Sequence, residues 1–110
     1  KHLPGFVIAI DQLKKKGIKK VVCISVNDPF VMDAWGKIHN VQDKILMVGD
    51  SSGDFTKNIG AELNLTNRGL GVRSSRYTML IEKGIILKIS EEEVAGKCEV
   101  TTAENLLKEI

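Results

Sequence analysis

The residues of this 110-residue sequence that could do redox chemistry are its two cysteines. Cys23 lies inside the β-branched run of residues 21–26, where a buried thiol behaves as a small, chemically inert hydrophobic group. Cys98 lies in a polar segment beside Lys97, so we expect it to be exposed, more reactive and able to form a disulfide with a mobile partner. Neither position fits a secreted disulfide scaffold, which favours a reducing compartment.

Arg76 is the residue best placed for anion chemistry. It precedes a largely apolar predicted strand, residues 77–81, so its guanidinium lies near a sheet edge and requires an anionic partner. A surface ion pair is the default interpretation, and the alternative is that Arg76 holds a thiolate or an oxyanion. His2, two residues before Pro4, is by default a polar group at the start of a helix.

Residue spacing and charge leave several other kinds of site unsupported. His2 and His39 lie far apart and no Cys/His grouping has metal-ligand spacing, so no metal site is expected. The sequence has no Cys-x-x-Cys, no phosphate-binding loop and no Gly-x-Ser-x-Gly elbow. A net charge of +2 is too small to imply nucleic acid as a partner. No apolar stretch approaches the roughly 18 residues of a membrane span, so no membrane partner is expected.

The first half of the sequence alternates helices and strands. Apolar residues at helical spacing over 3–13 predict a helix that Gly17 ends as a left-handed cap. The runs 21–26 and 45–48 predict strands that are buried on both faces. Between these strands, residues 27–29 (Asn-Asp-Pro) supply a capping side chain and then a proline at the first position of a second helix.

The second half contains a hairpin between two helices. Asp54 can cap a short helix. Residues 77–81 and 85–89 predict the two strands of a hairpin. Thr101 and Glu104 form the capping-box pattern that opens a last helix.

This order of elements, α-β-α-β-α-β-β-α, predicts one α/β domain over residues 1–110. Strands joined through helices should be parallel, and the hairpin should add an antiparallel edge to the same sheet. The pattern is that of a thioredoxin-like fold, a mixed sheet flanked by helices, with its first strands missing from this sequence. Because the chain begins at Lys1 in the middle of a motif, we expect it to be a fragment of a longer polypeptide.

Three strings in the sequence resemble the peroxiredoxins of the five/type-II subfamily. Residues 25–37 (SVNDPFVMDAWGK) are close to the most distinctive string of that subfamily. Residues 1–6 (KHLPGF) resemble the segment that immediately follows Cys-Ser-x in these proteins. Residues 69–77 (GLGVRSSRY) resemble the plant type-II branch in particular. The match covers the whole chain in the same order and with similar spacings.

The resemblance implies a thioredoxin fold and the reduction of hydrogen peroxide and alkyl hydroperoxides to water and alcohols. The nucleophilic cysteine would lie three residues before Lys1, so the 110 residues are expected to be the C-terminal two thirds of the domain and inactive alone. Arg76 matches the family's active-site arginine, which stabilises the thiolate and the transition state. Cys23 matches the second cysteine of plant type-II members, and Cys98 lies near the resolving cysteine of animal type-five members.

The resemblance also implies partners. Glutathione, glutaredoxin or thioredoxin would be the thiol reductant, a homodimer is expected, and no metal or organic cofactor is implied. His2, Pro4 and Phe30 are the candidates for the substrate pocket or the subunit interface, although Phe30 could simply belong to the core. The expected location is a reducing compartment, cytoplasmic or organellar, with any targeting peptide upstream of Lys1.

A rival interpretation remains for this chain. It could be a catalytically inactive thioredoxin-like fragment that acts as a binding module. Such a module would contact its partner through an exposed sheet edge or through the surface around Phe30.

Overall fold

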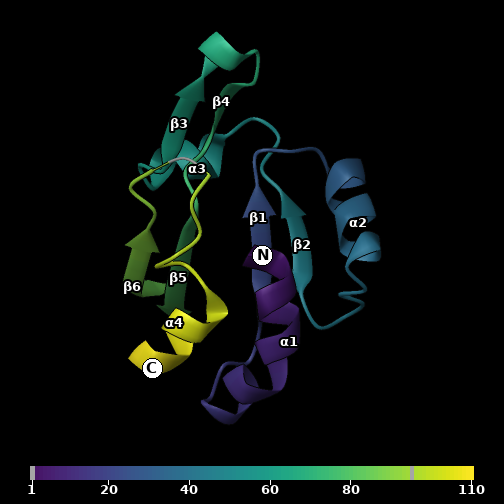
Figure 1. Ribbon diagram of the computed structural model, residues 1–110, viewed down its shortest axis with the longest axis vertical. Helices are drawn as coiled ribbons and strands as arrows, with labels where there is room; N and C mark the ends of the chain where they lie inside the picture. The colour runs from purple at the N-terminus through teal and green to yellow at the C-terminus, as the bar shows by residue number, and fades with distance from the viewer. Residues whose placement is uncertain (1, 95) are drawn as a thin grey trace.

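The computed structural model describes residues 2–94 and 96–110, which form a mixed α/β structure (Figure 1). Its dimensions are 42 × 28 × 26 Å, and a β-hairpin occupies one end of the long axis. The elements in chain order are α1 (His2–Lys15), β1 (Val22–Ser25), α2 (Pro29–Ile38), β2 (Leu46–Gly49), α3 (Asp54–Asn58), β3 (Glu62–Leu65), the 3-10 helix η1 (Thr66–Arg68), β4 (Gly71–Ser74), β5 (Tyr77–Glu82), β6 (Ile85–Glu91) and α4 (Ala103–Glu109).

The predicted signals at the ends of the first two helices are confirmed. After α1 the chain turns at Gly17, whose φ of 98° is in the left-handed region, where a side chain would be strained. At the start of α2, the Asp28 carboxylate accepts a hydrogen bond from the Val31 N–H at 2.8 Å, and Pro29 follows as the first helical residue. These local contacts depend on neighbours in the sequence, which is why the sequence predicts them.

The predicted starts of α3 and α4 are wrong in detail. Gly53, not Asp54, occupies the N-cap of α3, and the Asp50 carboxylate accepts the Phe55 and Thr56 amides at 3.3 and 2.9 Å. The N-cap of α4 is Thr102, whose hydroxyl accepts the amide of Asn105. The neighbouring Thr101 does not cap the helix, because its hydroxyl donates to Glu92 instead.

Strand pairing follows the prediction only in part. β1 and β2 pair in parallel, and β5 and β6 form the predicted antiparallel hairpin. β3 and β4 form a second hairpin, which the sequence analysis missed. The three pairs are separate two-stranded sheets in the described residues, so the β5–β6 hairpin does not extend the β1–β2 sheet as predicted.

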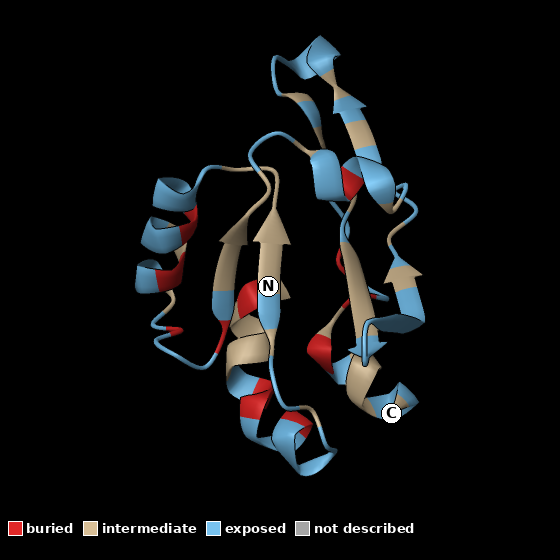
Figure 2. Ribbon diagram, turned by 180° about the vertical axis from the view of Figure 1, so that it is seen from behind, coloured by how far each residue is buried: buried red, intermediate tan, exposed pale blue. Residues whose placement is uncertain are grey.

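The core lies around α1 rather than around the strands. One buried cluster joins α1 to the segment before β2 through Leu3, Ile10 and Ile45, and a second joins α1 to α4 through Leu13 and Ala103. Figure 2 shows the buried residues on the helices and at the strand ends, while β1 and β2 are half-buried or exposed. The prediction of strands covered on both faces is therefore wrong, since Val22 and Leu46 are exposed and the other residues of β1 and β2 are only half-buried.

None of the helices in the described ranges is long and apolar enough to cross a membrane.

Candidate functional site

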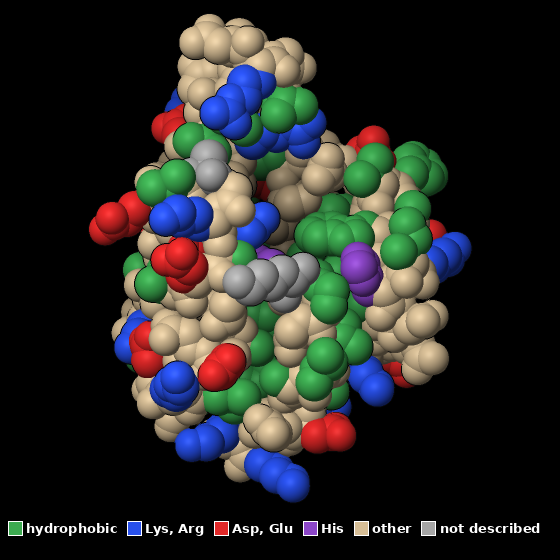
Figure 3. Space-filling view, viewed as in Figure 1, with side chains coloured by type: hydrophobic (Ala, Val, Ile, Leu, Met, Phe, Trp, Pro, Cys, Tyr) green, Lys and Arg blue, Asp and Glu red, His purple; other side chains and the backbone are tan. Residues whose placement is uncertain are grey.

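A cavity of about 1140 Å³ separates β1 from β5. The edges of these two strands line it, because β1 pairs only with β2 and β5 only with β6 among the described residues. α1 adds His2 and Phe6 to the wall. Figure 3 shows hydrophobic side chains gathered around a hollow on this face, with basic side chains nearby. Apolar side chains from β1, β5 and α1 line much of the cavity, and charged residues, Arg76 among them, lie at several places on its wall.

Arg76 lies directly before β5 and is one of the charged residues that line the cavity. Its Nη1 donates a hydrogen bond to the carbonyl oxygen of Lys97 at 3.0 Å. In residues 2–94 and 96–110, no carboxylate oxygen lies within 4.0 Å of the Arg76 nitrogens, so the default prediction of a surface ion pair is wrong. The carbonyl engages one of five guanidinium donors, and the remaining donors are available to an anion.

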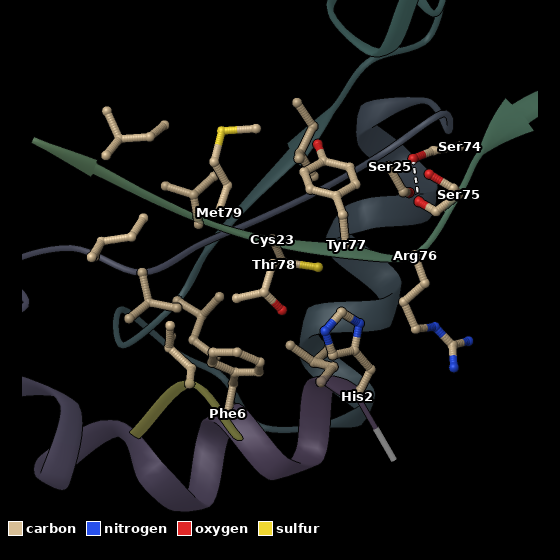
Figure 4. A pocket seen from close by; sticks show the side chains of 18 of the residues that line it. His2, Phe6, Cys23, Ser25, Ser74, Ser75, Arg76, Tyr77, Thr78 and Met79 are labelled. Atoms are coloured by element: carbon tan, nitrogen blue, oxygen red, sulfur yellow. Dashed lines mark hydrogen bonds between the residues drawn. The ribbon is translucent and has the colours of Figure 1, made fainter. Parts of the chain in front are cut away.

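His2 lies beside Arg76 at the same end of the cavity (Figure 4). Its ring packs edge-on against Phe6, with centroids 5.6 Å apart and planes at 72°. Burial lowers the pKa of His2 below its usual 6.5, and the positive charge of Arg76 lowers it further, against the opposing influences of the Thr101 backbone and Glu92. Both causes favour the neutral form of the His2 ring, which lies beside the Arg76 guanidinium.

Cys23 reaches the cavity from β1. Figure 4 shows its sulfur among His2, Tyr77 and Thr78. The side chain is half-buried rather than fully buried, and burial raises the pKa of its thiol to about 11. The predicted inertness agrees with this raised pKa, since the thiolate is the nucleophilic form.

Cys98 contradicts its sequence prediction. Only 6% of its surface is exposed, although we expected an exposed and reactive thiol. The turn that follows folds inward, so that the Cys98 sulfur lies 3.8 Å from the Thr101 hydroxyl oxygen. The polar neighbours of Cys98 in the sequence did not reveal this burial, because Glu92, which directly follows β6, accepts the hydrogen bonds of the turn.

Two other candidates lie away from the cavity. Phe30 is 85% exposed, so it is not part of the core. Neither Phe30 nor Pro4 is among the described residues that line the cavity. A place for them at a subunit interface stays a prediction.

The sequence analysis missed Glu92. It lies between two other glutamates in residues 91–93, and nothing in that acidic run distinguishes it. In the structure its Oε2 accepts four hydrogen bonds from the turn at residues 99–101. The sequence offered one signal. Arg76 directly precedes the first strand of the predicted hairpin and Glu92 follows its second strand, so the pairing of these strands brings the two residues together.

The comparisons with known proteins agree with this fold. The model of the redoxin family matches residues 1–107. Peroxiredoxin-2B of Arabidopsis thaliana is 42% identical over 108 residues, which cover 98% of this chain and 66% of the relative. The crystal structure of reduced Prx3 in complex with H2O2 from Vibrio vulnificus has a TM-score of 0.91 at 41% identity, covering 99% of this chain and 69% of that one.

The class defined here is a mixed α/β protein with a thioredoxin-like fold. The chain belongs to the redoxin family, and its relatives within that family are peroxiredoxins. The resemblance found in the three sequence strings is confirmed. The chain spans just under two thirds of the length of Peroxiredoxin-2D and Peroxiredoxin-2B, and 47% of the chloroplastic Peroxiredoxin-2E.

Proposed function

We propose that this chain forms the C-terminal two thirds of a thiol peroxidase domain that reduces hydrogen peroxide and alkyl hydroperoxides. The observation that carries the proposal is Arg76, a guanidinium at the cavity with no carboxylate partner in the described residues. Kinship with peroxiredoxins supports it. The nucleophile is a cysteine three residues before Lys1, at the start of the helix that continues as α1.

The proposed reaction is a two-electron oxidation of sulfur. The cysteine thiolate attacks one peroxide oxygen, an S–O bond forms, and the O–O bond breaks. The leaving oxygen takes the peroxide proton and departs as water or an alcohol, and the sulfur becomes a sulfenate. A helix N-terminus lowers the pKa of a thiol, and a nearby cation has the same effect. Arg76 also stabilises the negative charge that develops on the leaving oxygen.

A thiol then reduces the sulfenic acid, releasing water and forming a disulfide. Cys23 is the first candidate for this resolving thiol and Cys98 the second. Cys23 lines the cavity, whereas Cys98 is almost fully buried. Two further thiols, from thioredoxin, glutaredoxin or glutathione, reduce this disulfide by two exchange steps and become a disulfide themselves, in a reducing compartment that is cytoplasmic or organellar. The assembly is a homodimer in which the exposed Phe30 lies at the interface.

The test is peroxide consumption by the polypeptide that contains the proposed cysteine and these 110 residues. The expected result is rapid consumption that disappears when the cysteine is replaced by serine. Residues 1–110 alone should react no faster than ordinary thiols. A fast reaction of residues 1–110 alone would move the nucleophile to Cys23 or Cys98.

The strand edges favour a second candidate, an inactive binding module. Among residues 2–94 and 96–110, no strand pairs with the edges of β1 and β5 that line the cavity, and such edges are sites for an added strand. Intact mass and N-terminal sequencing of the natural protein separate the two candidates. About fifty further residues that include a cysteine support the peroxidase, and a natural start at Lys1 supports the binding module.

A further inference from the structure

Glu92 holds a turn that contacts Arg76. One of its carboxylate oxygens, Oε2, accepts the backbone amides of Glu99, Val100 and Thr101 at 2.9, 2.9 and 2.8 Å. The Thr101 hydroxyl donates to the same oxygen at 2.8 Å. Three consecutive amides directed at one oxygen form a backbone nest for an anion, and here the anion is the protein's own side chain.

Three hydrogen bonds connect Glu92 and the turn with the segment of residues 76–78. The amide of Glu92 donates to the carbonyl oxygen of Arg76 at 2.9 Å, so the two residues are joined through their backbones. The guanidinium of Arg76 donates to the carbonyl of Lys97, two residues before the nest begins. The Thr78 hydroxyl, two residues after Arg76, donates to the Thr101 carbonyl at 2.7 Å. Glu92 therefore fixes the segment that supplies the acceptor for Arg76.

The negative charge of the Glu92 carboxylate is stabilised by the hydrogen bonds of the nest. Partial desolvation acts to raise the pKa of Glu92, but the hydrogen bonds from Thr101, Glu99 and Val100 outweigh it and lower the pKa. The carboxylate stays ionised while its acceptor oxygen is occupied by amides and a hydroxyl. It forms no ion pair with Arg76 within 4.0 Å. The guanidinium of Arg76 is therefore not in contact with the carboxylate of Glu92, although Glu92 lies close in the fold.

We propose that Glu92 is a positioning residue that orients Arg76 through the turn at residues 97–101 without neutralising it. The inference rests on the proposed peroxidase function. Loss of the nest would free the Lys97 carbonyl and release the Arg76 side chain from its orientation. Misplacement of a catalytic group by about 1 Å costs on the order of 100-fold in rate.

The first test measures the rate constant for peroxide in the polypeptide that contains the proposed cysteine. Glu92→Ala should lower it about 10-fold to 100-fold, and Glu92→Gln, which keeps an acceptor oxygen without the charge, should lower it less. Glu62→Gln is the control, because Glu62 is an exposed residue of the same charge that does not line the cavity, and it should leave the rate unchanged. The rate of reduction by the thiol partner should not change in any of these variants.

A double variant distinguishes positioning from general damage. In an Arg76→Ala background, Glu92→Ala should cause little further loss, because the residue through which it acts is already gone. A full additional 10-fold to 100-fold loss in that background would overturn the proposal. So would a wild-type rate in Glu92→Ala.

The second test separates this inference from the proposed function, since it needs no peroxidase activity. In the 110-residue chain, Glu92→Ala should increase hydrogen exchange at the amides of residues 99–101 and shift the Arg76 Nε–H resonance. Glu62→Gln should change neither the exchange nor the resonance. An Arg76 resonance that stays unshifted while the turn exchanges faster would show that Glu92 holds the turn but does not position Arg76, and the inference would fail.

Discussion

The guanidinium of Arg76 donates to the carbonyl oxygen of Lys97 at 3.0 Å, which ties the start of β5 to the loop before α4. The contact orients the arginine, and because a carbonyl carries no full charge, Arg76 remains available to an anion. Sequence analysis identified Arg76 as the candidate, and the structure supplies the contact that holds it.

Replacing Arg76 should slow the proposed peroxide reaction severely. We expect Arg76→Ala to lower the rate constant by about 100-fold to 1000-fold, the usual loss on removing a donor that stabilises developing negative charge. Arg76→Lys should recover part of that loss, since it restores charge without the planar fork. Stopped-flow peroxide consumption measures both, with the exposed Lys57→Ala as the control. Unchanged single-turnover consumption in Arg76→Ala would remove Arg76 from the mechanism.

His2 should titrate below the usual histidine range and respond to Arg76. Burial is the first cause of its lowered pKa and the charge of Arg76 is the second. Arg76→Gln should therefore raise the pKa of His2 but leave it below 6.5, because burial remains. Titration of the His2 ring protons by NMR measures the shift, and Lys57→Gln should have no effect. A pKa of His2 that stays the same in Arg76→Gln contradicts the predicted proximity.

The thiol of Cys23 should react slowly at neutral pH. The pKa of this thiol is about 11, whereas an ordinary cysteine has a pKa of 9.0. At neutral pH this difference leaves about 100-fold less thiolate than an ordinary cysteine would have. In Cys98→Ser, which leaves Cys23 as the sole cysteine, alkylation by iodoacetamide should rise with pH up to about 11. A midpoint near 9 would show that Cys23 is not desolvated in the fold.

The same ionisation should affect stability. Because the folded-state pKa of Cys23 is raised, its contribution is fully present below pH 9 and is lost as the pH rises towards 11. The loss above pH 11 amounts to about 2 kcal/mol. Urea unfolding at pH 8 and pH 10.5 should show a smaller decline in Cys23→Ser than in the wild type. Equal declines in the two proteins would contradict the assignment.

Replacement of two glycines by alanine should change the free energy of unfolding in opposite directions. A Cβ at Gly49 would lie 2.6 Å from the carbonyl oxygen of Asn27 and 3.1 Å from the Asp28 carbonyl carbon, and backbone atoms cannot easily move away. Gly49→Ala should destabilise the fold by about 1–3 kcal/mol. Gly5 lies in α1, and a methyl group added there would have no atom within 4 Å, so Gly5→Ala should stabilise by up to about 1 kcal/mol. Chemical denaturation of both variants checks the signs, and a neutral Gly49→Ala would disprove the close approach.

Local chemistry explains what the sequence predicted correctly. Gly17 ends α1 and Asp28 caps α2 through contacts within a few residues. Apolar runs joined by a helix became the parallel β1–β2 pair, and the β5–β6 hairpin closes over a short turn. The β3–β4 hairpin was missed because its strands are joined through η1 rather than through a two-residue turn.

The sequence by itself determined the family, the order of most elements and Arg76 as the candidate for anion chemistry. Only the tertiary structure decided that Cys98 is buried, that Arg76 has no carboxylate partner in the described residues, and that Glu92 holds the turn beside it. The physical reason is separation along the chain. Arg76 and Lys97 are 21 residues apart in the sequence. The pairing of β5 with β6 is what brings Arg76 close to Glu92 and to the turn that Glu92 holds.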